Sequence, residues 1–556
     1  MPSKSRKRAR KSTAPQSIEV RSSSYWAWGL VIVTLLFVAA IRIRLLQIPL
    51  ERDEGEFAYM GQLILQGIPP YCLAYNMKLP GIYGAYALIM AVFGQTIGGI
   101  HLGLLLVNSI SIVLVFLLAR RLFDPLTGVV ACASVALLSV SPSLLGTSAH
   151  ATQFVLPFAL GGILLMLKAI DSDKPRTLFW SGLLLGLAFI IKQHAVFFIL
   201  FAGLYFLWSH LRTRPVAWTR LAGKTVLFLL GAALPFGLTC LALYAVGVFE
   251  RFWFWTFTYA REYVSALTVS DGWTFFSNGA EYVLSSFSWL WAIAAIGLTA
   301  LVWGSKARSN SSFLVGFVVL SFLAVCPGFY FLPHYFVLFL PAAALLIGVA
   351  ISSARQLLSA PKLPAALRTI PVLLFIAVLG CSVFQEKAFF FEMTPAEACR
   401  MMYGPNPFPE SIEIAQYLKT HTREQDRIVV LGSEPQIYFY SQRHSATGYI
   451  YTYGLVEYHK YAREMQREMA EQIESARPKY VVLVDIQTSW LVREKSDLSI
   501  LDWANEYCRR HYRTVGVADI ISEDRSLLYW DDEIKDYSPS SSYCVYVLER
   551  RTTSRG

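Results

Sequence analysis

The sequence predicts a polytopic α-helical membrane protein with a small α/β domain outside the membrane. Hydrophobic residues make up 55% of the 556 residues and charged residues only 16%, which is more apolar surface than a soluble chain of this length could cover. Apolar stretches long enough to span a bilayer, or nearly so, recur before residue 390. After residue 390, helix-like and strand-like segments alternate.

Eleven apolar segments are predicted to cross the membrane. They lie near residues 25–47, 100–119, 126–142, 153–170, 177–191, 195–209, 224–246, 288–304, 311–327, 334–352 and 369–385. The first segment lacks a small-residue cleavage signature, so we expect an anchor rather than a removed signal peptide.

Lysine and arginine gather in the N-terminal tail and in alternate loops between these segments. The clusters are Lys4 to Arg21, Arg120 and Arg121, Lys168 to Arg176, Arg212 to Lys224, Lys306 with Arg308, and Arg355 to Arg368. Because cytoplasmic loops are enriched in basic residues, this pattern predicts an inner-membrane protein with a cytoplasmic N-terminus and an extracytoplasmic C-terminus. It also accounts for the net charge of +11, so no nucleic-acid partner is expected.

These signals divide the chain into four parts. They are a basic cytoplasmic tail over residues 1–24, a transmembrane domain over 25–390, a linker over 391–409 and an outer α/β domain over 410–556. Within the outer domain we expect helices over 410–420 and 457–475 and buried strands over 428–431, 480–484 and 543–548. Cys399, Cys508 and Cys544 could supply one disulfide in an oxidising compartment.

The first outer loop, residues 48–98, is more than a connector. It opens with the acidic run Glu51 to Glu56, and carboxylates at a membrane boundary are costly to keep and are usually functional. Helices lying in the membrane interface are expected over residues 54–66 and 82–94, with a Pro/Gly turn over 67–71 between them.

Short motifs then follow one another in a characteristic order. They are Asp53-Glu54, Lys78-Leu79-Pro80, the run Leu117 to Phe123, Lys192 at an outer helix hairpin, Arg261 within Tyr259 to Tyr263, and Pro333-His334-Tyr335-Phe336. This order resembles the membrane-embedded C-type (GT-C) glycosyltransferases. Within them it is most similar to the family that includes protein O-mannosyltransferases and the aminoarabinose transferase of lipid A. The resemblance covers most of residues 25–352 and implies the GT-C fold.

The resemblance implies an inverting enzyme that moves a sugar from a polyprenyl-phosphate carrier to an acceptor hydroxyl at the outer membrane face. A hydroxyl is a weak nucleophile and needs a carboxylate to take its proton. Asp53 is the candidate base, and Glu54 could share this task or bind sugar hydroxyls. The alternative is that both only cap the helix that begins near Gly55. Glu51 and Glu56 are expected only to surround these two acids, without a role in the reaction.

The leaving phosphate gains negative charge as the glycosidic bond breaks, and preorganised cations stabilise that charge. The candidate donor-phosphate ligands are Lys78, Lys192, Arg261, His334 and Tyr335. The alternatives are that the lysines extend to lipid head groups, that Arg261 pairs with Glu262, and that Tyr335 anchors the membrane interface.

The family often carries a second acid in the next outer loop, where this sequence has His150 and Gln153. We expect these two residues to bind the acceptor or the sugar; alternatively, His150 is a hydrogen-bonded helix-end residue. Hard cations prefer several anionic oxygens, so no metal ion is predicted. No Walker loop, Rossmann glycine fingerprint or nucleophile elbow appears between a strand and a helix, so no ATP or nicotinamide cofactor is expected either.

Two other classes of function fit the composition. A lipid-linked saccharide flippase would also place charges among many spans, but transporters usually show internal repeats, and no convincing repeat is found. A sensory or acceptor-binding protein that has lost catalysis would not need Asp53 and the basic residues. The transferred sugar is left open, and so is the acceptor, which could be a lipid, a glycan or a protein. The outer domain is expected to recognise the acceptor or to cover the active site.

Overall fold

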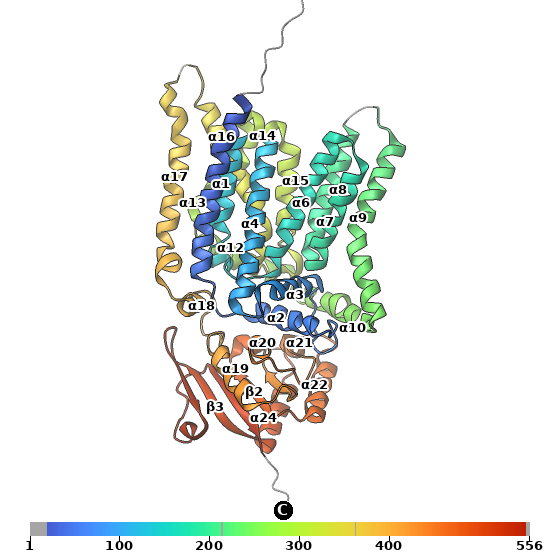
Figure 1. Ribbon diagram of the computed structural model, residues 1–556, viewed down its shortest axis with the longest axis vertical. Helices are drawn as coiled ribbons and strands as arrows, with labels where there is room; N and C mark the ends of the chain where they lie inside the picture. The colour runs from blue at the N-terminus through green and yellow to red at the C-terminus, as the bar shows by residue number, and fades with distance from the viewer. Residues whose placement is uncertain (1–18, 213–214, 362, 552–556) are drawn as a thin grey trace, which may run out of the picture.

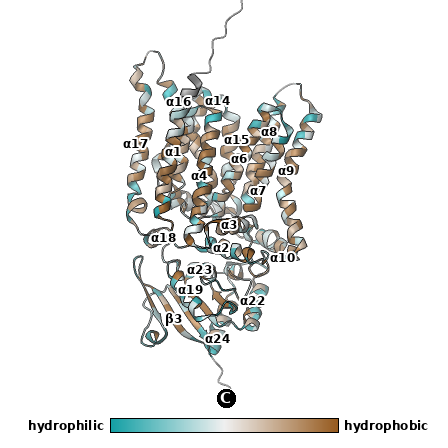
Figure 2. Ribbon diagram, viewed as in Figure 1, coloured by the Kyte–Doolittle hydropathy of each residue, from teal (hydrophilic) through white to brown (hydrophobic). Residues whose placement is uncertain are grey.

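The computed structural model describes residues 19–551 except 213, 214 and 362. A helical bundle carries the C-terminal α/β domain at one end, and helices α2 (Arg52–Leu65) and α3 (Gly81–Phe93) lie across that end between the two (Figure 1). Hydrophobic residues cover most of the length of the bundle helices, whereas the C-terminal domain is mixed (Figure 2). Residues 1–18 of the predicted basic tail lie outside the described residues.

Each of the eleven predicted segments coincides with a helix of the bundle. These helices are α1 (Glu19–Arg44), α4 (Ile97–Leu122), α5 (Pro125–Leu138), α6 (Ala151–Ser172), α7 (Pro175–Ile191), α8 (Val196–Leu211), α9 (Trp218–Ala245), α13 (Ser288–Trp303), α15 (Ser311–Leu323), α16 (Leu340–Leu357) and α17 (Ile370–Gln385). Further helices lie between them: α10 (Phe249–Trp253), α11 (Ala260–Val264), α12 (Val269–Ser285) and α14 (Ser305–Ser309).

Not all of these helices are long enough to cross a bilayer alone. Among the described residues, seven helical segments have the length and composition of a span, or up to eight if α12 and α13, bent by 112° at their junction, count as one. Helices α5, α7 and α15 are apolar but shorter, with 14, 17 and 13 residues. The protein is therefore a multi-pass membrane protein, and eight of the eleven predicted segments meet this length and composition when the bent pair counts as one span.

Small residues bring two helices of the bundle into close contact. A Cβ atom added at Gly182 of α7 would lie 2.2 Å from the carbonyl oxygen of Phe228 in α9, and one added at Gly231 of α9 would lie 2.2 Å from that of Phe179. Packing of this kind replaces the hydrophobic effect as the driving force between helices in lipid. It fixes α7, whose last residue precedes Lys192, against its neighbour.

The first outer loop forms the two helices expected there. Helix α2 begins with a capping box, in which the Glu51 carboxylate accepts from the Glu54 amide at 2.9 Å and the Glu54 carboxylate accepts from the Glu51 amide at 3.2 Å. A Cβ atom at Gly55 would lie 2.5 Å from the amide nitrogen of Gln436, so α2 packs directly on the C-terminal domain at this glycine.

The C-terminal domain is a five-stranded sheet with helices against it. The strands are β1 (Ile428–Leu431), β2 (Tyr480–Asp485), β3 (Tyr512–Ile520), β4 (Ser526–Trp530) and β5 (Cys544–Arg550). Their order is β1-β2-β5-β3-β4; β1 and β2 are parallel and the other pairs antiparallel. The helices are α18 (Pro395–Tyr403), α19 (Glu410–His421), α20 (Gln436–Ser441), α21 (Tyr453–Val456), α22 (Ala462–Ala476), α23 (Gln487–Trp490) and α24 (Ser499–His511).

The predicted α/β character of this domain is confirmed, including strands β1, β2 and β5. Strands β3 and β4 and helix α24 were not predicted, because Arg513, Gly516 and Asp519 interrupt the apolar pattern of β3, which also carries an irregularity in its register. Cys399, Cys508 and Cys544 are free thiols.

Buried polar contacts fasten the C-terminal domain to the first outer loop. The Arg52 guanidinium donates to the Ser433 carbonyl at 2.6 Å and pairs with the Glu434 carboxylate at 2.6 Å. The amide of Tyr75 donates to the Gly448 carbonyl at 2.7 Å. Because removal of one partner from a buried ion pair is strongly destabilising, these contacts hold the domain in one position over the end of the bundle.

Candidate active site

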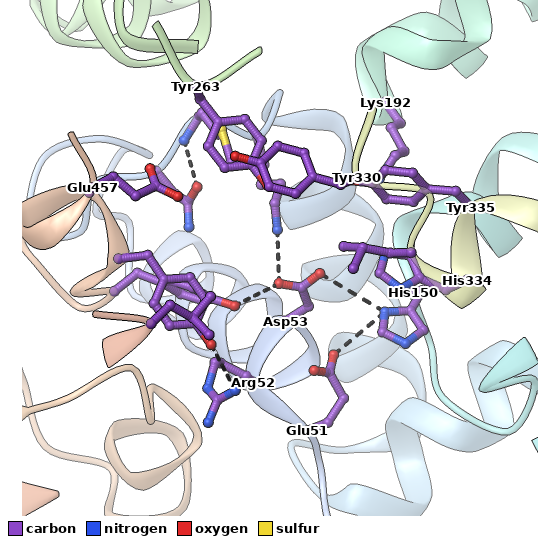
Figure 3. A pocket seen from close by; sticks show the side chains of 18 of the residues that line it. Glu51, Arg52, Asp53, His150, Lys192, Tyr263, Tyr330, His334, Tyr335 and Glu457 are labelled. Carbon is purple, nitrogen blue, oxygen red and sulfur yellow. Dashed lines mark hydrogen bonds and ion pairs between the residues drawn. The ribbon is translucent and has the colours of Figure 1, made fainter. Parts of the chain in front are cut away.

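A cavity of about 510 Å³ lies where the first outer loop, one end of the bundle and the C-terminal domain meet (Figure 3). Each of the three regions contributes charged or polar side chains to its wall. The first outer loop supplies Glu51, Arg52, Asp53 and Lys78, the bundle supplies His150, Lys192, His334 and Tyr335, and the C-terminal domain supplies Tyr451, Tyr453, Glu457 and Arg493.

Asp53 lies at the centre of this group, in the first turn of α2 (Figure 3). Its Oδ1 accepts from Lys78 Nζ at 3.0 Å and from Tyr451 Oη at 3.1 Å. Burial by itself would raise the pKa of Asp53, but the charges of Lys78, His334 and His150 outweigh burial and hold this pKa well below its usual value. Asp53 is therefore an ionised carboxylate with one oxygen fixed by two donors.

Glu54, the neighbour of Asp53, lies behind the cavity wall and is completely buried. Its carboxylate accepts from the Ala149 amide at 2.6 Å and is 3.0 Å from His101 Nε2, in addition to the capping bond with Glu51. The structure does not bring Glu54 to the cavity, whereas Glu51, expected to be a bystander, does line it.

Lys78 bridges two acids. Its Nζ is 3.0 Å from Asp53 Oδ1 and 3.5 Å from Glu56 Oε2. Glu56 is completely buried, where it accepts from Tyr83 Oη at 2.7 Å and Asn76 Nδ2 at 2.6 Å. Burial raises the pKa of Glu56 to about 7 although Lys78 opposes the shift. Burial alone would lower the pKa of Lys78, but its two acids raise it above the ordinary value, so Lys78 is a fixed cation.

Three predicted phosphate ligands gather on another side of Asp53. Lys192 follows the last residue of α7, and its Nζ lies 4.3 Å from the centre of the Tyr335 ring. His334 and Tyr335 open η5 (Pro333–Phe339), which leads into α16. All three are buried and line the cavity. Among the described residues, no carboxylate lies within 4.0 Å of Lys192 Nζ, and burial lowers the pKa of this lysine to about 7. An anion bound beside Lys192 would favour its charged form.

Two predicted site residues lie elsewhere. Arg261 is exposed and lines a separate surface groove with Glu262 and Lys460, and Glu262 pairs with Lys460 at 3.1 Å. Gln153 is buried and donates to the Gly146 carbonyl at 3.4 Å, outside the cavity wall. Their predicted roles in binding donor phosphate and acceptor stay predictions.

Asp53, His150 and His334 offer ligand atoms within 4.8 Å of one another. A carboxylate with two imidazoles suits a transition metal better than a hard cation. The two imidazole rings, however, stack face to face, with centres 4.0 Å apart and planes at 10°. Because lone pairs lie in the ring planes, two parallel rings cannot both direct a lone pair at one ion, so at least one ring would have to turn. Lys78 already balances the charge of Asp53.

The C-terminal domain supplies cavity residues that sequence reasoning missed. Tyr451 contacts Asp53, and Glu457 accepts from Tyr259 Oη at 3.0 Å. Burial raises the pKa of Glu457 to about 7. The run of three alternating tyrosines from Tyr449 to Tyr453, followed by an acid, was the available signal, but only the docking of the domain shows that it faces Asp53.

Two solved structures share the fold of this chain. ArnT from Cupriavidus metallidurans bound to undecaprenyl phosphate superposes with a TM-score of 0.58 at 16% identity, covering 95% of this chain and 98% of that one. The oligosaccharyltransferase AglB from Archaeoglobus fulgidus, in complex with an inhibitory peptide and a dolichol-phosphate, superposes with a TM-score of 0.52 at 13% identity, covering 92% and 75%. The chain has the fold of the GT-C glycosyltransferases.

Sequence relatives narrow the resemblance. Residues 80–238 match the family model of dolichyl-phosphate-mannose-protein mannosyltransferases. The undecaprenyl phosphate-alpha-4-amino-4-deoxy-L-arabinose arabinosyl transferase of Pseudomonas paraeruginosa is 32% identical over 247 residues, which are 41% of this chain and 42% of that protein. A second such transferase, from Pseudomonas fluorescens, is 28% identical over 346 residues, 59% and 56% of the two chains. The matches thus span about half the length of these curated relatives. The predicted similarity to mannosyltransferases and aminoarabinose transferases is confirmed.

Proposed function

We propose that this protein is an inverting glycosyltransferase that moves a monosaccharide from a polyprenyl-phosphate carrier to an acceptor hydroxyl. The observation that carries the proposal is the placement of Asp53. An ionised carboxylate stands in a cavity whose wall also presents the buried amine of Lys192, which has no carboxylate within 4.0 Å among the described residues. A base and an anion site in one enclosed space meet the two needs of this reaction. The similarity to arabinosyl transferases that use undecaprenyl phosphate supports the same donor class.

In the proposed reaction, the acceptor hydroxyl hydrogen-bonds to Asp53 Oδ2, because Lys78 and Tyr451 occupy Oδ1. The hydroxyl oxygen attacks the anomeric carbon and its proton passes to Oδ2. The bond between the anomeric carbon and the phosphate oxygen breaks, and the polyprenyl phosphate departs with the electron pair. One displacement of this kind inverts the anomeric centre.

The departing phosphate is proposed to lie against Lys192, His334 and Tyr335. These groups are held in place before the reaction by cation–π contact and ring stacking, so little reorganisation is needed as charge develops. Lys78 has a different task in this scheme, because both of its carboxylate partners are already present. It keeps Asp53 ionised and fixes its orientation.

The proposal places the cavity and the C-terminal domain on the outer side of the cytoplasmic membrane and the N-terminus inside, as the basic loops predict. The donor's polyprenyl chain would then lie among membrane lipids beside the bundle. A flippase without transferase chemistry is the alternative function, and the sequence and structural relatives named above are transferases.

The experiment is transfer of radiolabelled sugar by purified full-length protein. Polyprenyl-phosphate donors that carry a pentose, a hexose or an amino sugar are offered with mixed glycolipid and peptide acceptors. The proposal expects labelled acceptor and free polyprenyl phosphate in equal amounts from at least one donor. If intact donor moves from one leaflet to the other in proteoliposomes and no labelled acceptor forms, the protein is a flippase instead.

A further inference from the structure

The cavity has two chemically different ends, separated by Asp53. Lys192, His334 and Tyr335 lie to one side of Asp53, and Glu457 lies to the other (Figure 3). The first end carries the groups assigned above to the phosphate. The second end has no role in the reaction described so far, although it holds a buried carboxylate.

The second end is a continuous group of aromatic rings around Glu457. Trp255 stands 5.1 Å from Tyr259 and 5.9 Å from Tyr449, measured between ring centres. Tyr259 Oη donates to Glu457 at 3.0 Å. Arg493 also lines the cavity, and its charge acts to lower the pKa of Glu457. We call Trp255, Tyr259, Tyr449 and Glu457 the aromatic subsite.

The aromatic subsite is connected directly to the base. Tyr449 belongs to it, and Tyr451, two residues further along the same extended segment, donates to Asp53. A molecule seated on the subsite can therefore reach Asp53. In an inverting displacement the nucleophile approaches the anomeric carbon from the side opposite the leaving group. With the phosphate at the end that carries Lys192, the molecule at the aromatic end is the acceptor.

The chemistry of the subsite fits a sugar ring. The C–H faces of a sugar carry partial positive charge and pack on the negative faces of aromatic rings, while its hydroxyls donate to carboxylates. An acceptor peptide would need partners for its main-chain amides, as in strand addition to a sheet edge. A simple lipid alcohol would gain nothing from a buried carboxylate, which costs free energy unless it is hydrogen-bonded.

We propose that the aromatic subsite binds a saccharide acceptor and that Glu457 accepts a hydrogen bond from one of its hydroxyls. This inference rests on the proposed glycosyl transfer and adds the class of acceptor and the residues that select it. Glu457 acts on binding of the acceptor, and Asp53 acts on the transfer itself.

The test compares the full-length wild type with Glu457→Gln and Trp255→Leu, and with Glu471→Gln as a control for an exposed acid of the same domain. Transfer is measured with a lipid-linked disaccharide and with serine- and threonine-containing peptides as acceptors. We expect transfer to the disaccharide. Loss of a charged hydrogen-bond partner should raise the acceptor KM of Glu457→Gln about 10-fold to 100-fold, with the donor KM unchanged. Glu471→Gln should match the wild type.

Preference for the peptides, or a change in the donor KM instead of the acceptor KM, overturns the inference while leaving glycosyl transfer intact. If the wild type transfers to no acceptor, the proposed function fails. The subsite is then judged by saturation-transfer NMR of the disaccharide headgroup with detergent-solubilised protein. Binding that weakens in Glu457→Gln and Trp255→Leu supports the subsite, and absence of binding to the wild type refutes it.

Discussion

The first outer loop and the C-terminal domain contribute to the same cavity in different ways. The loop supplies paired charges, Asp53 with Lys78, whereas the C-terminal domain supplies Tyr451 and Glu457 among aromatic rings. Both members of the charge pair proposed for the proton transfer belong to the loop, since Lys78 is only 25 residues from Asp53. Groups that select a partner can come from a separate domain. The comparison therefore assigns chemistry to the loop and selection to the domain, with Tyr451 as the link.

The largest effect should come from breaking the junction between the two regions. Arg52→Met leaves Glu434 buried without its partner, and such a change typically costs about 3–5 kcal/mol. We expect a lower midpoint in thermal unfolding of the detergent-solubilised protein and faster proteolysis within residues 391–409. Arg467→Met, which removes an exposed partner of Glu471, is the matched control. Equal midpoints for Arg52→Met and wild type would show that the junction does not hold the domain.

Removing the charge that fixes the base should have the next largest effect. Lys78→Met should lower kcat about 100-fold to 1000-fold. Lys78 lowers the pKa of Asp53, so its loss raises that pKa, and the acid limb of the kcat/KM profile should move to higher pH. Lys535→Met changes an exposed lysine and should behave as wild type. An unshifted acid limb in Lys78→Met would separate Lys78 from the ionisation of Asp53.

Tyr451→Phe tests the link between the regions. It removes one hydrogen bond to Asp53 Oδ1 without changing the size of the ring, and a bond of this kind is worth about 0.5–1.5 kcal/mol. We expect kcat to fall about 3-fold to 10-fold with the donor KM unchanged. Tyr458→Phe alters a tyrosine that is 77% exposed and serves as the control. An intact kcat in Tyr451→Phe would mean that the domain does not position the base.

Glu54→Gln should have the smallest effect on catalysis. Its carboxylate accepts from the Ala149 amide away from the cavity, so the change should lower thermal stability by about 1–3 kcal/mol and leave kcat within about 3-fold of wild type. The measurements are the thermal unfolding midpoint and the steady-state kcat, the latter at a temperature well below unfolding. If kcat falls as much as expected for Lys78→Met, Glu54 takes part in catalysis and its assignment as a structural residue is wrong.

The sequence predicted the helices because apolar length is a local property, and each of the eleven segments is helical. The sequence also predicted that six residues belong to one site, and the structure places all of them on the wall of one cavity. They are Asp53, Lys78, His150, Lys192, His334 and Tyr335. The sequence alone could not assign different positions to the side chains of Asp53 and Glu54. The structure does so because both residues lie on a helix, which turns successive side chains about 100° apart.

The rest of the site depends on packing that no local pattern reports. Tyr451 and Glu457 are about 400 residues from Asp53 along the chain, and their approach depends on how Gly55 and Arg52 seat the C-terminal domain. Arg261 was expected to bind the donor phosphate because of its place in the family resemblance and its predicted outer-side position, yet it lines a separate groove.

The most direct test of the account is the transfer rate of Asp53→Asn with saturating donor and acceptor. Asparagine keeps the shape of the side chain but cannot accept the acceptor's proton. The account predicts a fall in kcat of about 100-fold to 10,000-fold, with undecaprenyl phosphate bound as tightly as by wild type to within about 3-fold. Turnover of Asp53→Asn equal to that of wild type would contradict the assignment of Asp53 as the base.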